Sequence, residues 1–206
     1  MYHRDFTAIV LAGGKSSRMG SDKQQLSYNG VFLIDTIIAN LEKHFTEIII
    51  VTNNKEFFDK RYEDLASNVI ITSDLIKELG PAVGLYTGLL ASSNEDNMLL
   101  ACDMPYFNHT YVDFLKSKNY DKALVWKNGR YFEPFFGLYK KYIHKDLLKY
   151  INSSRKSLNG FIATLNPTVI GPNDTTNIGN IEKIFTNLNY PADWEAYLKE
   201  NGFGIN

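Results

Sequence analysis

The segment from Leu11 to Lys23 holds the residues best suited to phosphate chemistry. It contains the pair Gly13-Gly14 and two cations, Arg18 and Lys23. Glycine has no Cβ, so backbone N–H groups beside it can approach a ligand closely. Arginine can hold phosphate oxygens through two parallel hydrogen bonds, and lysine acts as a point charge. The segment predicts a polyphosphate site, and a solvated turn with surface charges is the alternative that these residue types leave open.

Two common phosphate motifs are excluded. A P-loop has the pattern GxxxxGK[ST], and its first glycine would fall at Ile9, so Gly14-Lys15-Ser16 is a false match. The dinucleotide pattern GxGxxG is also absent from the segment. The loop therefore belongs to another class of nucleotide site.

The elements that must position this loop alternate between short apolar strands and amphipathic helices. Strands are expected at 7–12, 48–52, 69–72, 98–102, 123–126, 135–139 and 166–170, and helices at 32–45, 55–62, 83–91, 109–116, 142–151 and 191–201. This alternation predicts an α/β fold, a single Rossmann-like domain over residues 1–206 with a mainly parallel sheet and flanking helices. We expect residues 1–107 to form a nucleotide-binding half and residues 108–206 an acceptor-binding half.

Polar residues follow the first four predicted strands. They are Gly13-Gly14, Asn53-Asn54, Ser73-Asp74 and Asp103. In an open parallel sheet, ligands bind beyond the carboxyl ends of the strands. The sequence therefore predicts a binding edge that collects groups from four separate segments, although loops are also commonly polar.

The composition of the chain argues against some classes of function. The chain has 206 residues, 44% of them hydrophobic and 22% charged, and its formal net charge is −1. This balance does not indicate a nucleic-acid partner, and the longest apolar runs are too short to span a membrane. The single cysteine, Cys102, and the absence of a signal peptide predict a cytoplasmic protein. The four histidines are scattered and lack metal-site spacing.

The loop closely resembles the LAGGxSxRMGxDK signature of the molybdenum cofactor guanylyltransferases. These enzymes belong to the nucleotidyltransferases with a glycosyltransferase-A-like fold, whose other members more often read LAAG at this point. The resemblance extends to Gly80-Pro81-Ala82-Val83-Gly84, similar to a GPLAG segment, and to Cys102-Asp103-Met104-Pro105-Tyr106, similar to CDxPY. It implies nucleotide contacts at Leu11, Ala12, Gly13, Gly14, Lys23, Asn53, Asp74, Gly80, Pro81, Gly84 and Asp103.

The resemblance also implies the catalytic groups, Arg18, Lys23 and Asp103. Asp103 is the expected Mg²⁺ ligand, since Mg²⁺ takes oxygen ligands and commonly binds one or two carboxylates plus substrate phosphates. A helix cap or turn role is the alternative for this aspartate. On the acceptor side, the segment from Glu133 to Tyr139 and the segment from Phe185 to Pro191 resemble family segments, and they point to Glu133, Pro134, Asn187 and Asn189 as acceptor-binding residues. Tyr190 stands where the family has threonine.

The implied reaction is transfer of GMP from GTP to the phosphate of molybdenum-molybdopterin, with release of pyrophosphate. The implied partners are these two substrates and, transiently, other proteins of the same pathway, and we expect a monomer. A cytidylyl- or sugar-phosphate nucleotidyltransferase of the same fold is the nearest alternative. A non-catalytic nucleotide-binding module is the alternative from another class. Whether Asn53 or Asp74 would contact the base stays open.

Overall fold

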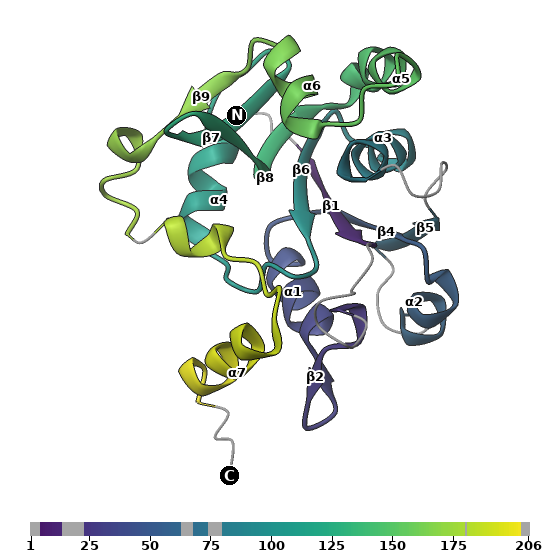
Figure 1. Cartoon of the computed structure of the whole chain (residues 1–206), viewed down its shortest axis with the longest axis vertical. Coiled ribbons are helices and arrows are strands. Elements are labelled where there is room, and N and C mark those ends of the chain that lie inside the picture. Colours follow the sequence, from purple (N-terminus) through teal and green to yellow (C-terminus); the bar gives the residue numbers. More distant parts are fainter. Residues whose placement is uncertain (1–4, 14–22, 63–67, 74–79, 180, 203–206) are drawn as a thin grey trace.

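Seven strands form one sheet in the order β5-β4-β1-β6-β8-β7-β9 (Figure 1). The computed structural model describes residues 5–13, 23–62, 68–73, 80–179 and 181–202. The sheet strands are β1 (Phe6–Ala12), β4 (Glu47–Thr52), β5 (Val69–Ser73), β6 (Asp96–Ala101), β7 (Ala123–Asn128), β8 (Tyr131–Lys140) and β9 (Thr168–Ile170). A separate hairpin pairs β2 (Ser27–Tyr28) with β3 (Val31–Phe32).

The predicted fold class is confirmed. Strands β5, β4, β1 and β6 are parallel neighbours. Strand β8 is antiparallel to both β6 and β7, and β9 is parallel to β7, so β8 alone among these seven described strands runs the other way. The carboxyl ends of β1, β4, β5, β6 and β7 consequently lie at one edge of the sheet, called here the carboxyl edge.

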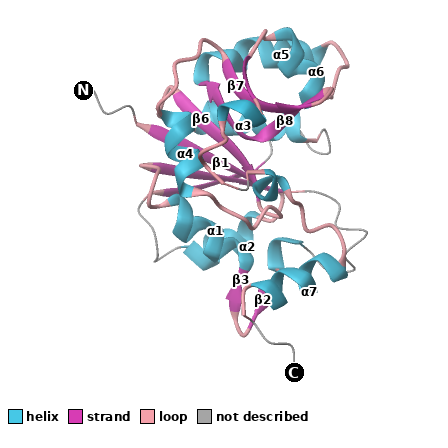
Figure 2. Cartoon of the chain, turned by 90° about the vertical axis from the view of Figure 1, so that its left-hand side faces the viewer, coloured by secondary structure: helices cyan, strands magenta, loops and turns pink. Residues whose placement is uncertain are grey.

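Helices cover both faces of the sheet. They are α1 (Leu33–Leu41), α2 (Lys55–Tyr62), α3 (Pro81–Ala91), α4 (His109–Lys116), α5 (His144–Asn152), α6 (Leu158–Thr164) and α7 (Pro191–Glu200), with short 3₁₀ turns η1 (Lys23–Gln25), η2 (Lys141–Ile143), η3 (Pro172–Asp174) and η4 (Glu182–Phe185). Helices α3, α5 and α6 share one buried cluster, and α1, α2, α4 and α7 share the other. Both views place α7 near the β2–β3 hairpin at the same end of the molecule (Figures 1 and 2). No described helix is long and apolar enough to cross a bilayer.

Helix α3 packs directly on β1 because two glycines face the strand. A Cβ added to Gly84 would lie 2.8 Å from Leu11 Cδ2, and one added to Gly88 would lie 2.3 Å from Ile9 Cγ2. Residues four apart share one helix face, and residues two apart share one strand face. The two glycines thus form a flat strip that receives Ile9 and Leu11.

Element boundaries differ from the sequence expectations at several points. Helix α3 begins two residues early, because Gly80 adopts φ +78° as the N-cap and Pro81 occupies the first turn. The helix expected over 32–45 ends at Leu41, although Phe45 still reaches the core. Helix α6 was not expected. Its short sequence contains Gly160, and its N-terminus is fixed by the Ser157 hydroxyl, which accepts from the Gly160 N–H.

We expect Gly88→Ala to destabilise the protein by about 1–3 kcal/mol, because the new methyl meets the fully buried, β-branched Ile9. Gly84→Ala is the matched control. Its methyl meets the flexible end of Leu11, and the gain in helix propensity of about 1 kcal/mol offsets the contact. Urea unfolding of both variants measures the difference, and equal free energies of unfolding would contradict direct packing at Gly88.

Candidate functional site

Three neighbouring strands deliver predicted site residues to the carboxyl edge. Strand β1 lies between β4 and β6, with Ala12 paired to Thr52 and Leu11 paired to Ala101. The residues that follow these strands therefore lie close together. They are Gly13 after β1, Asn53 after β4, and Cys102-Asp103 after β6.

The turn after β6 is held to β1 by backbone hydrogen bonds. The N–H of Cys102 donates to the Leu11 carbonyl at 3.1 Å, and that of Met104 donates to the Ala101 carbonyl at 3.2 Å. Cys102 is buried and is not part of a disulfide. Asp103 is only partly buried, so its carboxylate sits on a fixed turn at the edge of the sheet.

Gln24 positions the turn that carries Lys23. It is 4% exposed, its Oε1 accepts from Thr52 Oγ1 at 3.0 Å, and its Nε2 donates to Asn53 Oδ1 at 3.0 Å. These bonds anchor η1, which begins at Lys23, to the carboxyl end of β4. This positioning role of Gln24 was not predicted from the sequence. The only available signal was that a polar residue directly follows a predicted catalytic lysine.

The N-terminus of α3 also lies at the carboxyl edge, because α3 follows β5. Gly80 and Pro81 form its first turn, and a helix N-terminus favours anions. Gly84 lies one turn further on, with its missing Cβ facing Leu11. The structure thus gives Gly84 a packing role, and nucleotide contact at Gly84 stays a prediction.

The segment Phe185–Asn189 reaches the same edge. The Leu188 N–H donates to the Asp103 carbonyl at 2.8 Å, so Asn187 and Asn189 flank a residue bonded to the Asp103 turn. Asp193, at the start of α7, accepts the Asn189 N–H at 2.8 Å. Two backbone hydrogen bonds therefore fix this segment.

Phe185 anchors the segment in an aromatic cluster. Its ring centroid lies 5.7 Å from that of Trp126, 6.3 Å from Tyr111 and 6.4 Å from Phe136. Phe136 is buried and has φ +52°, an uncommon conformation for a bulky residue. The aromatic cluster thus anchors the chain two residues before Asn187, a predicted acceptor-binding residue.

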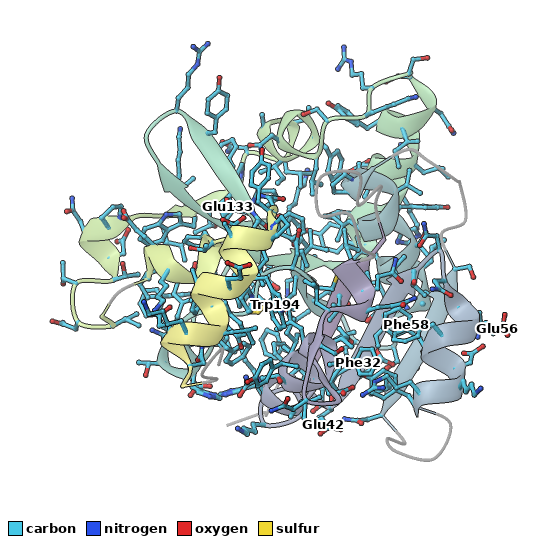
Figure 3. All side chains as sticks on the ribbon, turned by 60° about the horizontal axis from the view of Figure 1, so that its bottom comes forward. Phe32, Glu42, Glu56, Phe58, Glu133 and Trp194 are labelled. Atoms are coloured by element: carbon cyan, nitrogen blue, oxygen red, sulfur yellow. The ribbon has the colours of Figure 1, made fainter. Side chains whose placement is uncertain are left out.

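Glu133 and Pro134 lie where β8 departs from regular pairing. Glu133 pairs with Trp126, whereas Leu138 pairs with Leu124, so β8 bulges between them. The Tyr139 hydroxyl donates to the Pro134 carbonyl at 2.7 Å and closes the bulge. Figure 3 places Glu133 near the base of the β7–β8 hairpin.

Glu133 has an unusual electrostatic environment. Burial raises the pKa of Glu133, and the hydrogen bond from the Phe135 N–H only partly offsets this. Burial and the Glu133 charge together raise the pKa of Tyr111. The Tyr111 hydroxyl is fully buried and finds no hydrogen-bond partner among the described residues. Glu133 therefore lies in a setting that disfavours its charged form.

Several predicted residues cannot be placed. Gly14, Arg18 and Asp74 lie outside the described residues, and so does the side chain of Lys23. No group of three or more His, Cys, Asp or Glu that would hold a metal occurs in the described part of the chain. A single carboxylate such as Asp103 still suits Mg²⁺, which also takes substrate phosphates and water.

Two histidines that are distant in sequence meet in space. His44 Nε2 lies 2.7 Å from His109 Nδ1, and His44 Nδ1 lies 3.0 Å from Asp113 Oδ1. This contact joins the turn after α1 to α4, and sequence spacing gave no sign of it. Burial lowers the pKa of His44, although Asp113 opposes the effect.

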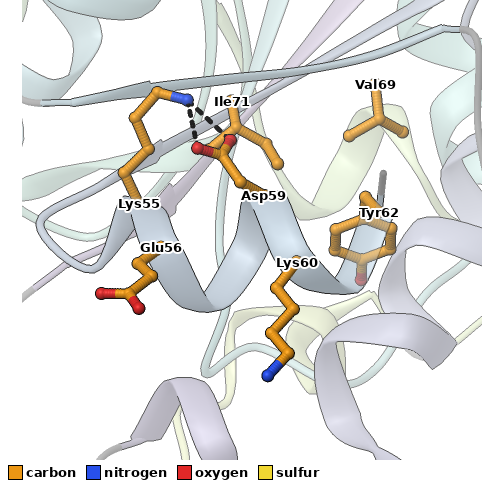
Figure 4. A pocket seen from close by; sticks show the side chains of 7 residues that line it. All are labelled: Lys55, Glu56, Asp59, Lys60, Tyr62, Val69 and Ile71. Atoms are coloured by element: carbon orange, nitrogen blue, oxygen red, sulfur yellow. Dashed lines mark hydrogen bonds and ion pairs between the residues drawn. The ribbon is translucent and has the colours of Figure 1, made fainter. Parts of the chain in front are cut away.

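A surface hollow beside α2 and β5 is separate from these residues (Figure 4). It is lined by Lys55, Glu56, Asp59, Lys60, Tyr62, Val69 and Ile71. Lys55 lies 2.6 Å from Asp59 and is paired with it. Among the described residues, no predicted site residue lines this hollow.

We expect Glu133→Gln to stabilise the protein increasingly as the pH rises. The folded state holds the Glu133 proton more tightly than the unfolded state, so native stability falls as the pH rises from the ordinary glutamate pKa to the raised one. The neutral glutamine lacks this loss. Thermal unfolding of both proteins from about pH 4 to about pH 8 measures the widening gap. Glu195→Gln, on an exposed position of α7, is the control for net charge, and a gap independent of pH would contradict the burial effect.

Comparison with known proteins agrees with this arrangement. The family model described as "MobA-like NTP transferase domain" matches residues 8–168. A probable molybdenum cofactor guanylyltransferase of Peptoclostridium acidaminophilum is 34% identical over 93% of this chain and 87% of its own length. A molybdenum cofactor guanylyltransferase of Syntrophotalea carbinolica is 28% identical over 97% of this chain and 94% of its own. The crystal structure of molybdopterin-guanine dinucleotide biosynthesis protein A from Archaeoglobus fulgidus superposes with a TM-score of 0.77 at 20% identity, covering 96% of this chain and 98% of that one. The chain therefore belongs to the MobA-like NTP transferase family.

Proposed function

We propose that this protein transfers GMP from GTP to the phosphate of molybdenum-bound molybdopterin. The names of its relatives support this substrate pair, since they are called molybdenum cofactor guanylyltransferases. The observation that carries the proposal is the meeting of Gly13, Asn53 and Asp103 at the ends of three adjacent parallel strands. Ligands of open α/β sheets bind at such an edge.

The chemistry requires alignment more than proton transfer. A phosphate oxygen of the acceptor forms a bond to the α-phosphorus of GTP while the bond from that phosphorus to the β-phosphate oxygen breaks. The pyrophosphate leaves with the electron pair. The attacking phosphate is already an anion at neutral pH, so positioning and charge neutralisation supply the catalysis. Arg18 and Lys23 would neutralise the charge that develops on pyrophosphate.

Asp103 is the residue that would hold Mg²⁺. Its turn is fixed by backbone hydrogen bonds to β1 and to Leu188. Asp103 therefore lies between the strand ends proposed to bind the nucleotide and the segment proposed to bind the acceptor. When bound, the ion would supply charge neutralisation to the phosphate oxygens and the leaving group. Asn53 would present its amide to the nucleotide, since Gln24 already engages its carbonyl oxygen.

We expect the purified protein to bind GTP more tightly than CTP, UTP or ATP, and only in the presence of Mg²⁺. Equilibrium titration of each nucleotide with and without Mg²⁺ measures this preference. A preference for CTP would contradict guanylyl transfer and favour cytidylyl transfer. The fold is compatible with either, since the inositol-1-phosphate CTP transferase of T. maritima superposes on this chain with a TM-score of 0.68. GTP binding without pyrophosphate release in the presence of acceptor would favour a binding module instead.

We expect Asp103→Asn and Lys23→Ala each to lower the transfer rate by about 100-fold or more, because each removes a charge to which the proposed mechanism assigns a role at the phosphates. The release of pyrophosphate measures the rate. Asp59→Asn, on the exposed face of α2, is the control, and it should leave the rate unchanged. Near-normal turnover in a folded Asp103 or Lys23 variant would remove that residue from the mechanism.

A further inference from the structure

Positive charge is concentrated in one stretch of the chain. Residues 121–160 contain nine Lys or Arg and three Asp or Glu, a net charge of +6, whereas the whole chain has −1. The rest of the chain is therefore acidic. Such segregation creates a local positive potential that the net charge of the whole chain does not reveal.

Only some of these cations are neutralised by an acidic partner. Lys140 pairs with Asp96, and Lys149 pairs with Asp146. Four that form no ion pair in the part of the chain that the structure describes are called here the basic rim: Lys127, Arg130, Arg155 and Lys156. Arg130, Arg155 and Lys156 are exposed, and Lys127 is partly exposed. Their charge is available to a ligand.

The topology places the Lys127 and Arg130 end of this rim at the carboxyl edge. Strand β8 is antiparallel to both β6 and β7, so β7 ends at the same edge as β6. The tip of the β7–β8 hairpin therefore lies on the side of the sheet where β6 leads into Asp103. The hairpin stands out from the body of the molecule, with Glu133 near its base (Figure 3).

Contacts join the two parts of the rim. The Phe132 N–H donates to Asn159 Oδ1 at 3.1 Å, which fixes the hairpin to α6. Within this region, Lys127 Nζ lies 5.0 Å from the Phe132 ring centroid, and the Arg155 guanidinium lies 5.8 Å from that of Tyr150. The Tyr150 ring in turn lies 5.4 Å from Phe161 of α6. The hydrogen bond from Phe132 to Asn159 thus links the hairpin that carries Lys127 and Arg130 to the helix that follows Arg155 and Lys156.

Tyr131 adds an aromatic face to this surface. Its side chain is 69% exposed, and the Arg130 guanidinium lies 5.8 Å from its ring centroid. An exposed ring beside an exposed arginine suits a planar heterocycle that carries oxyanions. Triphosphate at the nucleotide loop would repel a second anion, and a positive rim on the opposite half offsets that repulsion.

We propose that the basic rim and Tyr131 capture the acceptor of the transfer reaction, a planar pterin bearing a phosphate, before it meets the nucleotide. This inference rests on the proposed function. It assigns acceptor recognition to Lys127, Arg130 and Tyr131, outside the family-like segments around Glu133 and Asn187. An acidic protein is the other ligand that such a surface would attract.

The test is the binding of metal-free molybdopterin, followed by its fluorescence at low and high salt without GTP. In Lys127→Gln/Arg130→Gln we expect affinity to fall about tenfold or more and the salt dependence to become shallower. Tyr131→Ala should weaken binding without changing the salt dependence. The matched control is Lys122→Gln/Lys145→Gln, which removes one partly exposed and one exposed cation that form no ion pair among the described residues, and it should bind as wild type.

Several outcomes would overturn the inference. Equal affinity of rim and control variants, or a wild type that binds GTP but no pterin, would do so. A rim variant that keeps pterin affinity and loses only binding to polyglutamate would assign the rim to an acidic protein instead. GTP titrations of the same variants separate the two proposals. If the protein shows no preference for GTP, the proposed function fails, but the measured effect of the rim on pterin binding still stands.

Discussion

The contact of α3 with β1 through Gly84 and Gly88 is the constraint on which the rest of the structure depends. A helix with side chains on that face would stand further from the sheet, because Ile9 and Leu11 already fill the space. The close approach sets where the first turn of α3 ends up relative to Gly13 and Asn53. The two glycines therefore help to set the spacing between α3 and the strand ends that carry the candidate site.

The two halves of the chain are joined within the sheet, where β6 pairs with β8, and again at the carboxyl edge. The Leu188 N–H bonds the Asp103 carbonyl, and Phe185 enters the aromatic cluster formed by Tyr111, Trp126 and Phe136. The strand ends that carry Gly13, Asn53 and Asp103 rest on regular strand pairing, whereas the surroundings of Glu133 and Asn187 rest on a bulge and on aromatic packing. A bulged strand next to a site is a common means of re-aiming side chains.

Strands β1, β4 and β6 were predictable because they are buried and continuous and polar residues follow their ends, whereas the short β2–β3 hairpin was not expected. Helices α2 and α4 have the ranges expected from the sequence, since their apolar residues recur at helical spacing and polar residues lie between them. Helix α6 and the long strand β8 were not predictable in full, because their boundaries depend on tertiary pairing. The His44–His109 contact depends on which loops meet, which a single sequence does not encode in any local pattern, and the only local signal for Gln24 was its place directly after Lys23.

The bond between Leu188 and Asp103 has a consequence for the order of assembly. Strands β1, β4, β5 and β6 all precede Asp103 in the chain and pair with one another, whereas the second neighbour of β6, strand β8, follows Asp103. The Asp103 turn receives its bond from Leu188 only after eighty-five further residues have been added, so its loop-closure entropy is paid late. We therefore expect the carboxyl edge that carries the candidate site to reach its final geometry only after the segment around Leu188 has been made.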